Sequence, residues 1–196
     1  KNRLNEKYHI IENPSIKTIA SWIHKGNICA RFSERMEFGQ RALGNRSIIA
    51  DPRKWESVER VNKKIKYRDF WMPFTPSICY EGCDNYLENN KQVYSPFMTM
   101  AFDLKEEMSS NLPAVIHPAD KTCRPQMLKR HDNPEYYDII KEFEKLSGHP
   151  VLLNTSFNLH GDAIVESASQ AIETFEQSDI DILLLGGKAI IRTFRK

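Results

Sequence analysis

The chain has 196 residues, of which 40% are apolar and 28% charged, a composition typical of one globular domain with a hydrophobic core. Its apolar runs, such as residues 182–185, are far shorter than the roughly 20 residues that span a bilayer. No secretory signal is visible, so we expect a cytoplasmic protein. The net charge of +2 is too small to indicate a nucleic-acid partner by itself.

The first half of the chain predicts two helices and two strands. An Asn13-Pro14 cap, apolar residues at helical spacing over 16–23 and a closing Gly26 predict a first helix. Alternation over 28–32 predicts a strand, 33–46 a loop and 47–50 a short strand. Asp51-Pro52 repeats the cap signal before an amphipathic helix that reaches residue 65, and residues 70–76 predict a stiff extended segment.

The second half predicts the rest of a mixed sheet. Strands are expected over 97–104, 114–117 and 122–128, followed by a helix between Asn133-Pro134 and Gly148. Residues 151–153 predict a buried strand that leads into a polar loop over 154–162. A helix over 167–177 and a hairpin of 180–185 and 188–193 around Gly186-Gly187 complete the chain. Short strand-to-strand links exclude an all-parallel sheet, so the predicted fold class is α+β: a mixed, twisted sheet with helices on its faces.

The start of the chain predicts a piece of a longer protein, because residue 1 is Lys and not an initiator Met. We interpret residues 1–13 as a linker from an N-terminal domain and residues 14–196 as the domain itself.

The cysteines do not predict a metal site. Cys29, Cys79, Cys83 and Cys123 form no C-x-x-C pair and have no histidine at zinc-finger spacing. We expect them to be reduced thiols and expect no metal bound by this chain.

Basic residues gather between positions 35 and 68, and such a cluster is either a solvated surface or an anion site. It comprises Arg35, Arg41, Arg46, Arg53, Lys63, Lys64, Lys66 and Arg68.

The segment 34–47 is the first candidate for chemistry. Arg41 and Arg46 stand among two glycines, which let backbone N–H groups approach an anion, and arginine offers a planar fork to phosphate. Neither a P-loop nor a G-x-G-x-x-G motif is present. The alternative is a structural loop whose arginines pair with Glu34 and Glu37.

The segment 66–74 is the second candidate. If it is extended, Lys66 and Arg68 point to the same face, where two cations suit a polyphosphate. The alternative is an exposed helix end, where the dipole favours cations.

The segment 154–158 is the third candidate. Asn154, Ser156 and Asn158 alternate directly after an apolar strand, so all three could face one ligand, and Phe157 should point into the core. The alternative is a capped turn, which Asn and Ser also favour.

These segments together resemble a known family. The motifs RMEFGQRALGNRSI, KYRDFWMPFTPSI, SPFM, TCRPQ and LLNTSFNLHGD, in this order between about residues 28 and 190, resemble the C-terminal domain of the O-carbamoyltransferases of antibiotic, nodulation-factor and polysaccharide biosynthesis. The resemblance implies a YrdC-like fold that binds ATP, with Mg²⁺, and carbamoyl phosphate and forms carbamoyl adenylate. It further implies that a separate N-terminal Kae1-like domain holds a transition metal and passes the carbamoyl group to a hydroxyl.

The resemblance also implies roles for residues. Arg41, Lys66 and Arg124 take the catalytic positions, and Arg46 and Arg68 add cations around the phosphates. Asn154, Ser156 and Asn158 form the polar wall beside the adenylate. The sequence departs from the usual pattern at Glu34, where Gly is common, at Gln40, where Pro is common, and at Met72, where many members have Arg. The last departure would remove one phosphate contact, so that either Arg68 or Arg124 compensates or this chain binds the anion differently.

Two other functions are open at this point. A basic groove could bind nucleic acid, with Phe70, Trp71 and Phe74 stacking on bases. The domain could instead be inert and only dock to a partner. Low net charge and the neighbouring prolines disfavour the nucleic-acid interpretation.

Overall fold

The domain is built on one eight-stranded mixed sheet. A computed structural model describes residues 7–66 and 72–193. In spatial order the strands are β1 (Tyr8–Glu12), β10 (Lys188–Arg192), β9 (Ile182–Leu185), β2 (Cys29–Phe32), β3 (Arg46–Ala50), β8 (Val151–Ser156), β4 (Thr75–Cys79) and β7 (Gln126–Leu128). The β2–β9 and β4–β7 pairs are parallel and the other pairs antiparallel. The predicted mixed sheet is confirmed.

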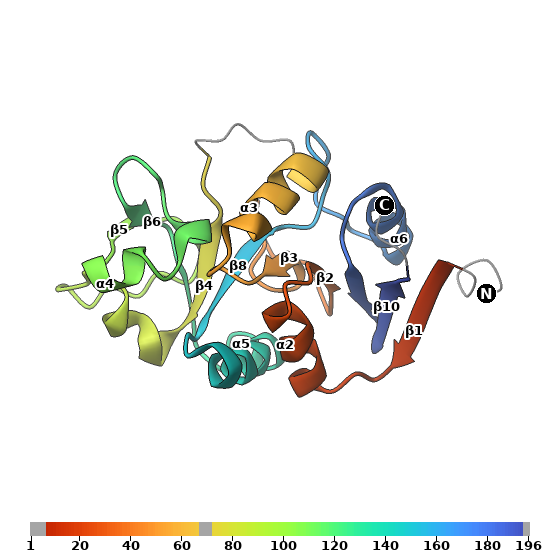
Figure 1. The fold of residues 1–196 in the computed structure, drawn as a ribbon, viewed down its shortest axis with the longest axis horizontal. Coiled ribbons are helices and arrows are strands. Elements are labelled where there is room, and N and C mark those ends of the chain that lie inside the picture. The colour runs from red at the N-terminus through yellow and green to blue at the C-terminus, as the bar shows by residue number, and fades with distance from the viewer. Residues whose placement is uncertain (1–6, 67–71, 194–196) are drawn as a thin grey trace.

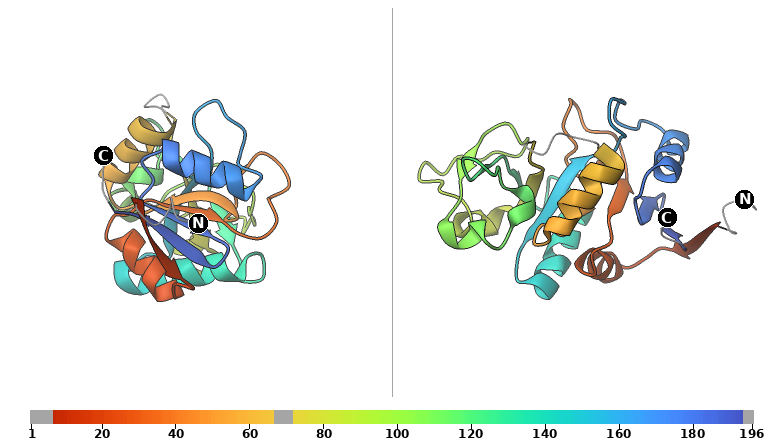
Figure 2. Two further views of the ribbon diagram at one scale, coloured as in Figure 1. Left: turned by 90° about the vertical axis from the view of Figure 1, so that its right-hand side faces the viewer. Right: turned by 45° about the horizontal axis from the view of Figure 1, so that its top comes forward.

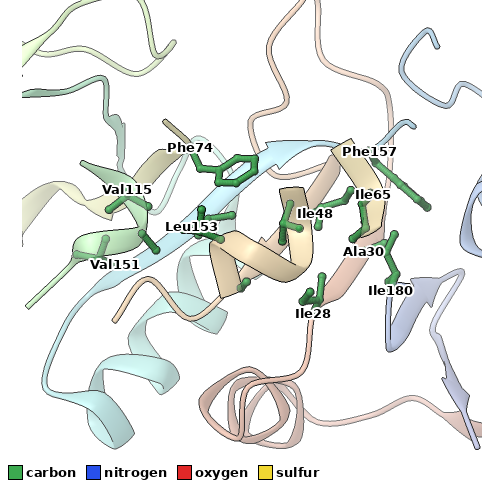
Figure 3. Packing of buried hydrophobic residues seen from close by; sticks show 14 of the residues in the cluster. Ile28, Ala30, Ile48, Ile65, Phe74, Val115, Val151, Leu153, Phe157 and Ile180 are labelled. Atoms are coloured by element: carbon green, nitrogen blue, oxygen red, sulfur yellow. The ribbon is translucent and has the colours of Figure 1, made fainter. Parts of the chain in front are cut away.

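Helices cover both faces of this sheet (Figures 1 and 2). One face packs against α3 (Trp55–Val61), the π-helical turn η1 (Asn62–Lys66) and α6 (Ala168–Gln177), and the other packs against α2 (Ile16–His24) and α5 (Pro134–Ser147). Neighbouring strand residues alternate between the two cores, as the pleat requires: Ile48 lies in the first and Ile49 in the second. Figure 3 shows the first core, where Ile65 and Ile48 pack beside each other.

Two helices begin and end where the sequence predicted. Asn133 caps α5 by accepting a hydrogen bond from the Tyr136 amide at 3.2 Å, and Gly148 ends it in the left-handed conformation, with φ of 80°. Ser167 caps α6 through the Gln170 amide. Local side-chain chemistry therefore determines these boundaries.

Two other predicted helix starts are wrong. Ser15 caps α2, whereas Asn13 adopts a φ of 45° and donates its backbone N–H to Gly187 O at 2.6 Å. Helix α3 begins at Trp55, because the buried Asp51 carboxylate bonds the amide and guanidinium of Arg53 instead of a helix terminus. Each predicted cap residue bonds another partner: Asn13 a residue distant in the sequence, and Asp51 a residue two positions away.

The N-terminal residues also differ from the prediction. Residues 8–12, predicted as part of a linker, form β1 and pair with β10 along its full length. The hairpin of β9 and β10 is confirmed, with Gly186 and Gly187 at φ of 56° and 74°.

The region between β4 and β7 contains less strand than predicted. It comprises η2 (Tyr80–Asn85), β5 (Phe102–Asp103), α4 (Glu106–Ser109), η3 (Pro113–Val115) and β6 (Thr122–Cys123). Residues 114–117 were predicted as a strand. Instead, Ala114 lies in the short turn η3, and its amide donates a hydrogen bond to Pro52 O. The strands β5 and β6 form a separate two-stranded sheet beyond the β7 edge (Figure 1).

Strand β8 is longer than predicted. Residues 151–153 are buried in a strand as expected, but β8 continues to Ser156, so Asn154 and Ser156 belong to the sheet and not to a loop. Phe157 follows and is fully buried in the first core, which confirms its predicted orientation (Figure 3).

Phe157→Ala should therefore lower the free energy of unfolding by about 3–5 kcal/mol, the cost of emptying a buried aromatic site. Phe97→Ala, at a side chain that is 59% exposed, is the matched control and should change stability little. Urea unfolding followed by circular dichroism measures both. Equal losses in the two variants would contradict the buried position of Phe157.

Candidate functional site

Two adjoining cavities open where β4, β8 and the 33–45 loop meet. The larger, of about 520 Å³, is lined mainly by residues 72–75 and by the segment from His117 to Arg124. The smaller, of about 60 Å³, is lined by Gln40, Ala42, Met98 and residues 154–156. Both cavities are lined by Arg41, Arg124, Pro73, Phe74 and Thr75, so they are two parts of one site.

Two arginines from distant parts of the sequence share this site. Burial lowers the pKa of Arg41, and the nearby charge of Arg124 lowers it further. Within the described part of the chain, neither guanidinium forms an ion pair or hydrogen bond. Among the described lining residues the one carboxylate is that of Asp120, which bonds Thr122 and His117 instead. Uncompensated positive charge of this kind favours an anion.

Lys66 is buried beside the end of β8. It lies in η1, and its ammonium group donates to Ser156 O at 2.6 Å, Ser156 Oγ at 3.1 Å and Asn158 O at 3.0 Å, and also to Asn158 Oδ1. Ser156 Oγ in turn contacts Asn158 Oδ1 at 2.7 Å. The structure thus brings together three of the predicted site residues, and Lys66 holds the turn that follows β8.

Asn154 lies under the smaller cavity in a buried polar network. Its Nδ2 donates to Ala42 O at 3.2 Å, to Ser77 Oγ at 3.0 Å and to Gln126 Oε1 at 3.2 Å. Gln126 Nε2 donates to Leu43 O at 2.8 Å. This network ties the backbone on the C-terminal side of Arg41 to the sheet. Asn154 Oδ1 is buried and has no partner among the described residues.

Two residues of this network, Ser77 and Gln126, were not predicted from the sequence as parts of the site. Gln126 ends the motif TCRPQ, which was a signal that the residue matters, but pattern alone could not show that it reaches residue 43. Ser77 carried no signal beyond its place in a buried strand.

Arg46 does not reach these cavities. Its guanidinium donates to the carbonyls of Ser33 at 2.7 Å, Asn45 at 3.0 Å and Glu34 at 3.1 Å, and it lies 3.6 Å from the centroid of the Phe32 ring. Its donors thus bind the loop itself, and the predicted phosphate contact has no support in this geometry. Arg68 lies outside the described residues, and Lys66 is in a π-helical turn and not in an extended segment.

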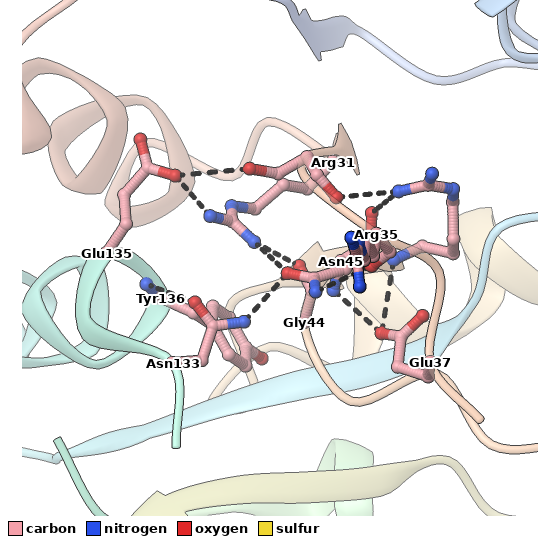
Figure 4. Close-up of polar contacts among 10 residues, drawn as sticks. Arg31, Arg35, Glu37, Gly44, Asn45, Asn133, Glu135 and Tyr136 are labelled. Carbon is pink, nitrogen blue, oxygen red and sulfur yellow. Dashed lines mark hydrogen bonds and ion pairs between the residues drawn. The ribbon is translucent and has the colours of Figure 1, made fainter. Parts of the chain in front are cut away.

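The opposite side of the loop is held by Arg31. Its guanidinium donates to Gly44 O at 2.5 Å and to Asn45 Oδ1 at 3.1 Å and pairs with Glu135 on α5 (Figure 4). Gly44 has a φ of 122° and packs on Tyr136, so close that a Cβ would lie 2.5 Å from the ring. No other residue type fits here without displacing α5 or the loop.

The structure shows where the three residues that depart from the family pattern lie. Glu34 adopts a φ of 45°, a left-handed conformation that explains why Gly is usual there. Gln40 lines the smaller cavity and Met72 the larger one.

Comparisons with known proteins agree with the fold and the motifs. The family profile described as Carbamoyltransferase C-terminus matches residues 20–192. An uncharacterised protein of Methanocaldococcus jannaschii is 46% identical over 192 residues, which cover 97% of this chain and 36% of that protein. Nodulation protein NolO of Bradyrhizobium diazoefficiens is 41% identical over 170 residues, covering 85% of this chain and 30% of NolO. The chain therefore belongs to the carbamoyltransferase C-terminal family, and it spans about a third of the length of these relatives.

Solved structures share the fold at low sequence identity. A Sua5 from P. abyssi matches with a TM-score of 0.60 and 18% identity over 90% of this chain and 50% of that one. Full-length HypF, in its phosphate- and nucleotide-bound form, matches with a TM-score of 0.57 and 13% identity over 95% of this chain and 22% of HypF. The YrdC-like fold implied by the resemblance is confirmed.

Two searches of the described residues were negative. None of their helices is both long and apolar enough to cross a membrane. Across residues 7–66 and 72–193, no group of three or more His, Cys, Asp or Glu side chains is placed to hold a metal ion.

Gly44→Ala should lower stability by about 1–3 kcal/mol, because the methyl group meets Tyr136 as well as an unfavourable φ. Gly39→Ala is a close control: its φ is 106°, but a Cβ there would meet no atom within 4 Å. Thermal unfolding compares the two. A loss at Gly44 no larger than that at Gly39 would show that the contact with Tyr136 does not constrain the loop.

Proposed function

We propose that this domain binds ATP and carbamoyl phosphate and forms carbamoyl adenylate, which a longer cytoplasmic enzyme uses to carbamoylate a hydroxyl of a metabolite or glycan. The observation that carries the proposal is the pair Arg41 and Arg124, which face one cavity without an acidic partner among the described residues. Membership of the carbamoyltransferase C-terminal family supports it. HypF, which has the same fold, is known in a phosphate- and nucleotide-bound form.

The proposed reaction brings several negative charges together. Carbamoyl phosphate and water give carbamate and phosphate; a carbamate oxygen then attacks the α-phosphate of ATP, and pyrophosphate leaves. The protein must place these groups and offset their repulsion. Arg41 and Arg124 supply positive charge inside a partly buried cavity, where it acts more strongly than in water. No nucleophilic side chain is needed for this step.

The two cavities suggest where each part of the substrates binds. The larger one, of about 520 Å³, has room for a nucleotide, and the smaller one, of about 60 Å³, suits a group as small as the carbamoyl head. The free lone pairs of Asn154 Oδ1 could accept a hydrogen bond from the carbamoyl NH₂. Ser156, which lines the smaller cavity, would face the substrate there, and Lys66 and Asn158 would hold it in place.

ATP would bring Mg²⁺ on its phosphates, where the ion supplies further positive charge. Asp120 is the carboxylate that lines the larger cavity, but it is engaged by Thr122 and His117. Among the residues that the structure describes, the arginine side chains would therefore make the main contacts with the ATP phosphates. A transition metal and the final transfer would belong to the Kae1-like N-terminal domain that we propose as partner.

The nucleic-acid alternative is weakened by the position of Phe74. This ring is 2% exposed and packs in the core, so it is not available for stacking on a base. Phe70 and Trp71 lie outside the described residues.

Arg41→Ala, Arg124→Ala and Lys66→Ala should each weaken binding of ATP or carbamoyl phosphate by about 1–3 kcal/mol, the scale of a charge-assisted hydrogen bond. The first two remove a charge from the cavity, and the third frees Ser156 and Asn158. Arg130→Ala removes an exposed arginine paired with Asp138 and should leave binding unchanged. Isothermal titration calorimetry measures all four. Unchanged affinity in the three site variants, with the fold intact, would refute the assignment.

The domain alone should make the adenylate without completing the transfer. Incubated with ATP, carbamoyl phosphate and a range of hydroxyl acceptors, it is expected to release pyrophosphate but to yield no O-carbamoylated product. Mass spectrometry of the acceptors and a pyrophosphate assay give the two readouts. An O-carbamoylated product formed by this chain alone would contradict the division of the reaction between two domains.

A further inference from the structure

The loop that carries Arg41 is closed by a carboxylate of the same loop. Glu37 Oε1 accepts hydrogen bonds from the backbone amides of Leu43 at 2.7 Å, Asn45 at 2.7 Å and Arg46 at 3.2 Å. Figure 4 shows Glu37 below this turn, on the side opposite to Arg31. The sequence indicated that backbone N–H groups of this segment could approach a bound anion, with a structural loop as the alternative. In the structure these amides instead bind the carboxylate of Glu37, a residue of the same loop.

This arrangement is stronger than an ordinary turn. Three N–H donors that converge on one oxygen form a nest, and an ionised acceptor binds such donors more strongly than a neutral one. If the carboxylate were removed, three partly buried amides would lose their acceptor. The loop conformation therefore depends on one side chain.

Arg41 lies inside the ring that Glu37 closes. The bond from Glu37 to the Leu43 amide joins residues 37 and 43, and Arg41 is between them. On the other side, Gln126 and Asn154 hold the carbonyls of Leu43 and Ala42. The backbone next to Arg41 is thus fixed from both sides, and this resists the repulsion that Arg124 exerts on the Arg41 guanidinium.

We propose that Glu37 is a positioning residue: it acts as an internal anion that holds the Arg41 loop closed, so that Arg41 and Arg124 face the same bound anion. The identity of that anion rests on the proposed function, but the closing role of Glu37 does not. Glu37 itself does not touch the substrate. The amides of Leu43, Asn45 and Arg46 already have an acceptor in Glu37, so these three amides are not available to a bound phosphate, whereas the Arg41 side chain is.

The test compares Glu37→Ala with Glu37→Gln, whose amide oxygen can still accept the N–H groups. Glu34→Gln is the matched control, because it removes an exposed charge from the same loop. Glu37→Ala should weaken ATP binding about tenfold or more, the effect of losing one charge-assisted interaction. Glu37→Gln should lose less, and Glu34→Gln should bind as the parent protein does. Acetate, compared with chloride at equal ionic strength, should restore binding to Glu37→Ala by occupying the vacated nest.

A double-mutant cycle tests whether Glu37 acts through Arg41. If it does, Glu37→Ala should add little to the loss caused by Arg41→Ala. Full additivity would overturn the proposal, as would the absence of acetate rescue. Tighter binding by Glu37→Ala would also overturn it, since that result means that Glu37 occupies the substrate's place.

Hydrogen exchange separates this proposal from the proposed function. Without any ligand, the amides of Leu43 and Asn45 should exchange faster in Glu37→Ala and slow again with acetate, while the strands keep their protection. If the parent protein binds neither ATP nor carbamoyl phosphate, the proposed function fails; inorganic pyrophosphate then serves as the probe of the Arg41–Arg124 pair. Unchanged exchange at both amides would overturn the role of Glu37 whatever the ligand is.

Discussion

The placement of two arginines on one cavity is the constraint on which this site depends. Arg41 and Arg124 are brought to one cavity, and the pKa of Arg41 is lowered by burial and by its neighbour. Left to themselves, two exposed arginines would move apart into water. A site that keeps them together must hold the backbone of each, and in the proposed function a bound phosphate would relieve the repulsion. The fold thus holds the two positive charges in place before an anion binds, and this favours anion binding.

The sheet supplies the rigidity that this requires. Asn154 on β8, Ser77 on β4 and Gln126 on β7 meet in one buried network, and two of them hold the carbonyls of Ala42 and Leu43. These three strands are neighbours in the sheet although they are far apart in sequence. Phe157 anchors the end of β8 in the core, and beside it Lys66 ties η1 to the turn that follows the strand. The packing of the core therefore also fixes the positions of the polar residues of the site.

Much of the fold could be predicted because its signals are local. The Asn133 cap, the Gly148 terminus and the Gly186-Gly187 hairpin each depend on residues that touch within a few positions. Two of the wrong predictions involve distant partners: Asn13 bonds Gly187, and Ala114 bonds Pro52. Residues 8–12 become a strand only because β10 offers an edge, which no local pattern shows.

The same distinction applies to the site. The motifs singled out Arg41, Lys66, Arg124 and the 154–158 segment, and the structure places them around the two cavities and the turn after β8. Arg46 has the same residue type and lies in the same motif as Arg41, but its guanidinium binds three carbonyls of its own loop. Sequence alone could not separate these two arginines, since the difference lies in which of them has acceptors nearby. The role of Gln126 was hidden for the same reason.

A crystal structure of this protein with ATP and carbamoyl phosphate tests the account most directly. We expect phosphate oxygens between Arg41 and Arg124, with Glu37 still bonded to the amides of Leu43 and Asn45. Phosphates bound instead at the loop amides, with Glu37 displaced, would contradict it.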